Sequence, residues 1–426
     1  MNLWAEFDNH QQSPDATGSV NLLRARRLTE RAILSSLRDW LLHDYAAAYC
    51  RSLAATRIFR RCYWVDALGI DGKSNTTTAE DTLPVSNSAA KGRKKATAQS
   101  MPPALQPIVS LSQLLAQENK PITLNGLMLE AGSSKRKDAK VGQNGTSSKP
   151  VIIPKESGIV QASWLEAAPT LLKEIEQSPA IFLLNPFGPT MFTYDDLALL
   201  CQRTVPTELC LLIPHKQLEA RLLVARRTPA QATLLTGLLR TDRWKTLPSS
   251  EGELPQALDG LFDFFTASIQ RYFPLSVQRI ALPMQVRPAI VEEVPYTLIF
   301  ATRRQDSVAS MNDAICLYRR RVYAQSRRGL LGEEWFAKQE QLRLSMELQQ
   351  LYQHTVQQGR AQRTRRWPDL RQQLLLANFG QFTMQDYDTI IRQLLINGEV
   401  RCEWRQRNVA SGEEHVPGND DILLWR

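Results

Sequence analysis

Residues that could build a metal centre are scarce and scattered in this sequence. Its 426 residues include six cysteines and five histidines, and no two cysteines form a Cys-x-x-Cys pair. Structural zinc and iron–sulfur sites need closely spaced ligands of this kind, so no metal site is expected. Cys201 and Cys210 lie near the expected sheet, where a buried, reduced thiol acts as a small apolar side chain.

Long apolar runs are also missing. The chain has no stretch of about 18 uncharged apolar residues, the length that a membrane-spanning helix needs. Its first residues, Met1 to Glu6, lack the basic-then-apolar order of a secretion signal. We therefore expect a cytoplasmic protein that has no membrane partner.

The composition is that of a protein with a substantial core and a basic surface. Hydrophobic residues make up 43% of the chain, and 426 residues exceed the usual length of one domain, which predicts a large domain with an appended module. The net charge of +9 permits an acidic partner such as nucleic acid, because clustered cations release condensed counterions on binding. Charge alone does not establish such a partner.

Apolar runs rich in strand-forming residues alternate with helical patterns along much of the chain. These runs are Cys62–Val65, Leu124–Leu129, Gly158–Ala162, Ala180–Leu184, Glu208–Ile213, Ile280–Met284 and Tyr296–Ala301. The alternation predicts an α/β fold with a mostly parallel, doubly wound, Rossmann-like sheet. The last two runs are close together and precede a helix from about Val308 to Tyr318, which suits a reversed strand at the edge of the sheet.

Four parts are expected along the chain. In order, they are an N-terminal helical segment (1–60), a Rossmann-like domain (61–325), a helical linker (326–360) and a C-terminal module (361–426). The domain contains two polar insertions, near 73–106 and 132–149, whose composition is typical of disorder.

The C-terminal module has the element order of a winged helix. Asp369–Ala377 and Thr383–Ile396 have helical patterns, and Thr383 is a suitable N-cap for the second helix. Two short strands follow, Val400–Trp404 and Ile422–Trp425, with a loop rich in glycine, proline and acidic residues between them. From Ala361 onward arginines and acids balance, so the module fits a protein contact as well as it fits DNA.

Acidic residues and glycines follow the first two expected strands. In a doubly wound sheet the ligand binds beyond the carboxyl ends of the strands, where glycines let the backbone approach it. Asp66, Gly69 and Gly72 follow the first strand, in a turn that can pack against adenosylmethionine while the carboxylate orients the loop or binds the methionine ammonium. Glu130 follows the second strand, where an acid accepts hydrogen bonds from ribose hydroxyls. An ordinary surface acid is the alternative for Glu130.

A polar, rigid and aromatic turn, Asn185-Pro186-Phe187-Gly188, follows the buried strand Ala180–Leu184. In methyltransferases that act on amino groups, this order lets the Asn side chain and the Pro carbonyl accept the target N–H groups. The aromatic ring stacks on the planar substrate, and an enzyme acting on a duplex base must also flip that base. The alternative is a strand-ending turn without catalytic function.

Further segments follow this turn in a characteristic order. Thr207-Glu208 introduces the next strand, Leu239–Lys245 reads L-R-T-D-R-W-K, and Tyr296–Thr302 precedes Met311–Ala314. With the strand ends above, the series runs from about residue 22 to residue 320 and resembles the three-Cys-motif partner proteins. The resemblance implies a methyltransferase-type fold and a partner protein that carries a three-cysteine, radical-adenosylmethionine-like motif.

The first turn and the Asn185 turn both depart from the pattern of that family. Ile70-Asp71 replaces Gly-Pro in the first turn, and Asn185 replaces an aspartate. A β-branched residue disfavours the positive φ angle that such a turn needs. These departures favour a catalytically degenerate member, and they leave open whether the protein is an enzyme.

Arginines and one histidine complete the candidate residues. Residues 302–328 contain seven arginines and two aspartates, and Arg319, Arg320 and Arg321 form a candidate nucleic-acid-binding strip. A solvated helix end is the alternative interpretation. His215 is the nearest candidate for a general base, and a helix-start histidine without catalytic function is its alternative.

Two hypotheses follow. In the first, the chain is a methyltransferase-like protein that binds S-adenosylmethionine with Asp66, Gly69, Gly72 and Glu130, and holds a substrate on or near nucleic acid with the Asn185 turn. In the second, it is a degenerate relative that uses the same fold as a protein- or nucleic-acid-binding module.

Overall fold

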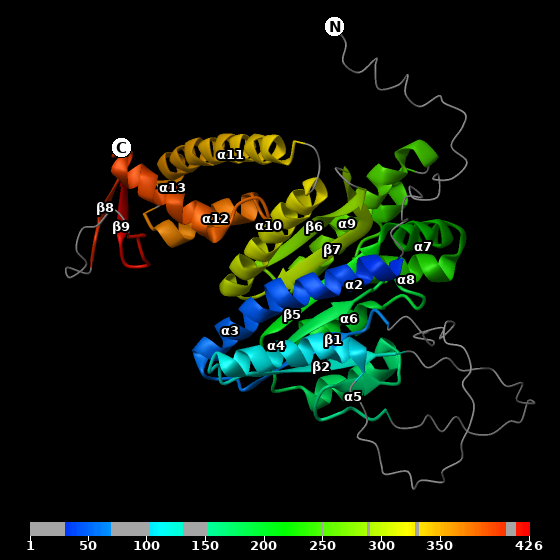
Figure 1. The fold of residues 1–426 in the computed structure, drawn as a ribbon. Helices are drawn as coiled ribbons and strands as arrows, with labels where there is room; N and C mark the ends of the chain where they lie inside the picture. The colour runs from blue at the N-terminus through cyan, green and yellow to red at the C-terminus, as the bar shows by residue number, and fades with distance from the viewer. Residues whose placement is uncertain are drawn as a thin grey trace, which may run out of the picture.

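A seven-stranded sheet forms the centre of the described part of the chain (Figure 1). The computed structural model describes residues 30–69, 102–130, 151–248, 250–287, 290–328, 332–363, 365–405 and 415–426. The strands are β1 (Arg61–Asp66), β2 (Thr123–Leu129), β3 (Gly158–Val160), β4 (Ala180–Leu184), β5 (Thr207–Pro214), β6 (Ser276–Arg287) and β7 (Ile290–Thr302). Each of the seven predicted runs lies largely within one of these strands, which confirms the mixed α/β fold.

The strand order is β3-β2-β1-β4-β5-β7-β6. β1 to β5 are mutually parallel, and β7 is antiparallel to both of its neighbours. The reversed strand therefore lies inside the sheet, between β5 and β6, and the prediction that placed it at the edge is corrected. Every residue of β4 and β5 is buried, as is typical of parallel strands that are covered on both faces.

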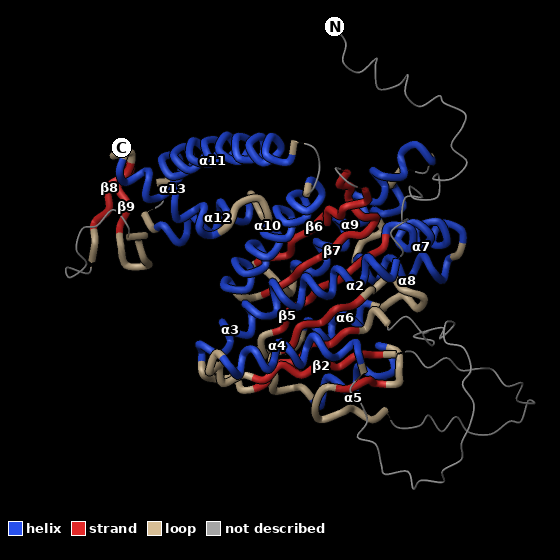
Figure 2. Tube along the Cα trace, in the orientation of Figure 1, coloured by secondary structure: helices blue, strands red, loops and turns tan. Residues whose placement is uncertain are grey.

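Helices cover both faces of the sheet (Figure 2). One face carries α2 (Glu30–Trp40), the π-helix η3 (Leu41–Ala46), α3 (Ala47–Thr56), α4 (Gln106–Gln117) and α10 (Gln305–Arg327). The other carries α5 (Trp164–Glu174), α6 (Tyr194–Cys201), α7 (His215–Arg227), α8 (Pro229–Leu239) and α9 (Leu254–Gln270). Successive strand residues alternate between the two cores, as Tyr63 and Trp64 do, because side chains of a strand point to opposite faces.

Short 3-10 turns complete the sheet domain: η4 (Pro103–Leu105), η5 (Arg243–Thr246) and η6 (Glu251–Glu253). The first of these leads into α4, so the end of the expected insertion near 73–106 is helical. The rest of that insertion, the insertion near 132–149 and the start of the N-terminal helical segment lie outside the described residues.

The C-terminal elements form a third core beside the sheet domain (Figure 1). They are α11 (Glu333–Gln362), α12 (Trp367–Ala377), α13 (Met384–Ile396), β8 (Val400–Glu403) and β9 (Ile422–Trp425), and the two strands pair antiparallel. Thr383 caps α13 as predicted, because its hydroxyl accepts the Asp386 N–H while its own N–H donates to the Asp386 carboxylate. Gly359 of α11 lets Trp425 pack closely, since an added Cβ would lie 2.2 Å from the indole ring.

Asn312 of α10 joins the C-terminal elements to the sheet domain. Its amide donates to the Phe382 carbonyl over 2.7 Å, and its carbonyl accepts the Gly380 N–H over 2.8 Å. Asn312 is fully buried, so both bonds are shielded from water. The helix that packs on β6 and β7 therefore also positions the C-terminal elements.

Candidate functional site at the carboxyl end of the sheet

The carboxyl ends of β1, β2 and β4 lie next to one another, at what we call the carboxyl end of the sheet. β1 pairs with β2 on one side and with β4 on the other, and Asp66 lies opposite both Met128 and Leu183. This register brings the residues that follow these strands, Glu130 and Asn185, to the same end of the sheet as Asp66. Gly72, the remaining predicted cofactor residue, lies outside the described residues.

Asp66 is almost completely buried, with 1% of its surface exposed, and it orients the turn that follows β1. Arg38 of α2 donates from Nε to Asp66 Oδ2 over 2.6 Å and from Nη2 to the Gly69 carbonyl over 2.7 Å. The Leu68 N–H donates to Asp66 Oδ1 over 3.0 Å. One ion pair thus fixes both the carboxylate and the turn, and Arg38 is a site residue that the sequence did not reveal.

Gly69 gives this turn an open backbone. Its φ angle is +87°, in the left-handed region that favours glycine, and among the described residues beyond its chain neighbours no atom lies within 4 Å of the position where a Cβ would be.

Glu130 is held beside the end of β3 and is partly exposed. Its N–H donates to the Val160 carbonyl over 2.9 Å, and its Oε2 accepts a bond from the Gln161 amide over 3.0 Å. A carboxylate so placed retains free lone pairs, so it can accept hydrogen bonds from a ligand.

The turn at Asn185 makes most of its hydrogen bonds within the protein. Asn185 Nδ2 donates to Gln217 over 2.6 Å, and its Oδ1 accepts the Phe187 N–H over 3.1 Å. The Pro186 carbonyl accepts the Phe192 N–H over 2.9 Å. The groups predicted to hold a substrate are thus engaged in closing the turn.

Phe187 and the residues after it are fixed from the other side of the turn. The Phe187 ring, 1% exposed, packs edge-on against Phe265 with ring centroids 5.1 Å apart. Arg221 of α7 donates to the carbonyls of Gly188 and Pro189. The ring therefore contributes to the core beneath the turn, and a backbone shift would be needed before it could stack on a ligand.

His215 begins α7, directly after β5. Its Nε2 lies 2.9 Å from the Thr297 hydroxyl of β7, and its ring meets Phe262 edge-on at 5.7 Å. Burial, together with the nearby positive charge of Arg279, lowers the pKa of this imidazole. The neutral ring is favoured, as a proton acceptor requires, but the ring is already bonded to Thr297.

The predicted arginine strip on α10 contacts other parts of the same chain. Arg319 donates to the carbonyls of Gly380 and Ala281, Arg320 pairs with Asp386 over 2.7 Å, and Arg321 pairs with Asp44. These partners lie on three separate parts of the chain. Asp44 belongs to η3, Ala281 belongs to β6, and Gly380 and Asp386 lie just before α13 and in its first turn, respectively. The strip therefore holds the C-terminal elements and the N-terminal helices against α10.

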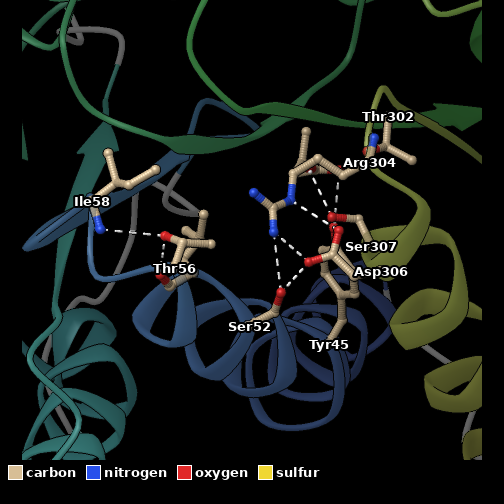
Figure 3. Close-up of polar contacts among 10 residues, drawn as sticks. Tyr45, Ser52, Thr56, Ile58, Thr302, Arg304, Asp306 and Ser307 are labelled. Carbon is tan, nitrogen blue, oxygen red and sulfur yellow. Dashed lines mark hydrogen bonds and ion pairs between the residues drawn. The ribbon is translucent and has the colours of Figure 1, made fainter. Parts of the chain in front are cut away.

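A polar cluster that the sequence did not point to lies at the opposite, amino end of the sheet (Figure 3). Arg304 pairs with Asp306, and the Ser52 hydroxyl bonds to both. The neighbouring Glu208 carboxylate is fully buried and accepts hydrogen bonds of 3.1 Å from the Tyr45 and Ser307 hydroxyls. The sequence pointed to Glu208 only as part of Thr207-Glu208, the pair that introduces β5.

Burial raises the pKa of the Glu208 carboxyl to about 7, even though hydroxyl groups bond to it. The nearby Tyr49 hydroxyl is also buried and has no hydrogen-bond partner in the described structure. Glu208, Tyr45 and Tyr49 are fully buried, so their interactions bear on stability, whereas the side chains of Arg304 and Asp306 are 20% and 40% exposed.

The structure contains no candidate metal site among its described residues, since no three His, Cys, Asp or Glu side chains gather there. Within the same residues, none of the helices is both long and apolar enough to cross a bilayer. No protein-family model, curated protein or solved structure matches the chain.

Proposed function

We propose that this chain is a methyltransferase-like protein of the three-Cys-motif partner type, which binds S-adenosylmethionine at the carboxyl end of its sheet. The observation that carries the proposal is the strand order β3-β2-β1-β4-β5-β7-β6 with β7 reversed. Adenosylmethionine-dependent methyltransferase domains share this order, and in a doubly wound sheet the ligand binds beyond the carboxyl ends of the strands.

The residues at that end suit the cofactor. The open, left-handed turn at Gly69 lets the nucleoside approach the backbone, and the partly exposed Glu130 carboxylate can accept the ribose hydroxyls. Asp66 acts through Arg38, by holding the turn in place. When bound, the cofactor would supply an electrophilic methyl group. Asn185 and Pro186 would line the methyl-acceptor side, and a planar substrate there would have to displace the bond from Asn185 to Gln217.

Calorimetric titration of the full chain with S-adenosylmethionine and S-adenosylhomocysteine tests this proposal. Glu130→Ala should weaken binding about tenfold, because it removes the charged acceptor of the ribose hydroxyls. Glu174→Ala, which removes an exposed carboxylate at the end of α5, is the matched control and should leave the affinity unchanged. Absence of binding at about 1 mM ligand overturns the proposal.

A second candidate function is that of a degenerate relative, which uses the fold to assemble with a partner protein or nucleic acid. The closed Asn185 turn and the buried Phe187 ring favour it, because neither presents a free group to a substrate. The winged-helix-like C-terminal elements would then provide the contact. Such a protein would bind its partner equally well with Glu130→Ala and Asn185→Ala, and would not bind S-adenosylmethionine.

A further inference from the structure

The segment Leu239–Lys245, which has no part in the proposed cofactor site, forms one wall of a surface pocket. The pocket has a volume of about 710 Å3 and opens on the outside of the helix layer formed by α6, α8 and α9. Its walls are the start of α6, the end of α8, the turn that follows it, and the residue after α9. None of its residues belongs to the strand ends described above.

Three cations surround this pocket against one acid. Arg240, Lys245 and Arg271 are exposed cations in its lining, and Asp242 is the acidic residue. In the described part of the chain none of the three cations forms an ion pair, whereas the arginines of the α10 strip are bonded to carboxylates or carbonyls. The lining therefore carries an excess of two positive charges, and no carboxylate among the described residues pairs with any of the three cations.

The pocket is built on an ordered frame. Trp244 is buried, and its indole N–H donates to the Thr236 hydroxyl over 2.9 Å, which anchors the turn to α8. The Arg240 guanidinium lies over the Tyr194 ring, 4.3 Å from its centroid. A ring holds a guanidinium in position without neutralising its charge, so Arg240 stays available to an anion.

We propose that this pocket binds the phosphate group of a nucleotide or of a nucleic-acid strand. Two arginines and a lysine provide charge-assisted donors, and an arginine can bind two phosphate oxygens at once. The Thr241 hydroxyl accepts the Arg243 N–H and keeps its own proton for donation. The volume leaves room for a group larger than phosphate.

Two probes on the full chain test the proposal and separate its two sources. Calorimetric titration with sodium pyrophosphate and with adenosine monophosphate measures binding of a small phosphate. A fluorescein-labelled oligothymidylate, followed by anisotropy at about 50 mM and about 200 mM salt, reports binding of a strand. Binding of pyrophosphate or adenosine monophosphate without binding of the oligonucleotide assigns the pocket to small phosphates, whereas binding of the oligonucleotide, with a steep loss at high salt, assigns it to a strand.

The decisive variant is the double substitution Lys245→Gln and Arg271→Gln. It should weaken binding of the active probe at least about tenfold, because each cation contributes a charge-assisted hydrogen bond. Arg243→Gln is the matched control: Arg243 is exposed and belongs to the same turn, but it does not line the pocket. The affinity of the Arg243→Gln variant for the probe should stay within about twofold of that of the unaltered chain.

Three results would overturn the proposal. The first is that the double variant binds the active probe with the affinity of the unaltered chain. The second is that Arg243→Gln loses as much affinity as the double variant. The third is that neither kind of probe binds, with the small phosphates tested up to about 10 mM. The single substitution Arg271→Gln, which should show a smaller loss, keeps the test valid if the double variant does not fold. None of these outcomes depends on whether S-adenosylmethionine binds at the carboxyl end of the sheet.

Discussion

The two ends of the sheet hold their buried carboxylates in different ways. At the carboxyl end, Asp66 is paired with Arg38, and the ion pair fixes the turn after β1. At the amino end, Glu208 accepts hydrogen bonds from the hydroxyls of Tyr45 and Ser307, while the nearby Arg304 pairs with Asp306. The comparison shows that a buried acid is stabilised by a full counter-charge at one end and by neutral donors at the other. Removal of Arg38 should therefore destabilise the carboxyl end of the sheet, whereas a change of pH should act at the amino end, through Glu208.

Arg38→Ala should have the largest effect, because it leaves the buried Asp66 carboxylate without its counter-ion. Breaking a buried ion pair from one side costs about 3–5 kcal/mol of unfolding free energy, which urea denaturation would measure. Adding Asp66→Asn to Arg38→Ala should recover part of that loss, because the uncompensated charge is removed. A loss below about 1 kcal/mol in the single variant would show that the pair does not hold this end of the sheet.

The second effect is a dependence of stability on pH that originates at Glu208. Its pKa is about 7 in the folded protein, against an ordinary value of 4.5, so between these values the folded state binds the proton more tightly than the unfolded state. The free energy of unfolding contributed by this group is therefore greatest below pH 4.5 and is lost as the pH rises through 7. The full fall should be about 3–4 kcal/mol, since one pKa unit corresponds to about 1.4 kcal/mol.

Glu208→Gln should flatten that dependence, which urea denaturation between about pH 5 and about pH 8 would measure. The amide still accepts a hydrogen bond but cannot ionise. Glu174→Gln, at an exposed position on α5, is the control and should keep the slope of the unaltered chain. An unchanged slope in Glu208→Gln would place the titrating group elsewhere.

The smallest effect is expected for the turn at the carboxyl end. Asn185→Ala removes the hydrogen bonds to Gln217 and to the Phe187 N–H, which should lower the free energy of unfolding by about 1–2 kcal/mol. Asn185→Asp keeps the acceptor for Phe187 and should cost less. If thermal unfolding shows Asn185→Ala and Asn185→Asp to be equally destabilised, the hydrogen bond that Asn185 Oδ1 accepts from the Phe187 N–H does not stabilise the turn.

The strands and the C-terminal helices could be predicted because their signals are local. Ala180–Leu184 has the predicted bounds, since an uninterrupted apolar run between polar turns can be buried on both faces. The N-cap at Thr383 depends on Asp386, three residues away, and was equally visible. No helix was predicted over α4 or α8, and of α7 only the start at His215 was considered, although Leu218, Leu222 and Ala225 of α7 are buried at helical spacing.

The position of the reversed strand and the partners of the charged residues could not be predicted. β7 lies between β5 and β6 because it pairs with both, and its sequence does not specify which backbone lies beside it. Arg38 and Asp66 are 28 residues apart, and Arg321 and Asp44 are 277 apart. The sequence suggested the arginine strip as a surface for phosphate, and only the fold shows that these arginines also bond within the chain.

The sequence by itself determined the order of the sheet strands and of the C-terminal helices along this chain, because hydrophobic spacing and capping act over a few residues. It also placed Asp66, Glu130 and Asn185 at strand ends. Only the tertiary structure decided which of these groups are engaged within the protein and which charges have no partner. The physical reason is that burial and ion pairing depend on side chains from distant segments, so the unpaired cations around Arg240 emerge only once the chain has folded.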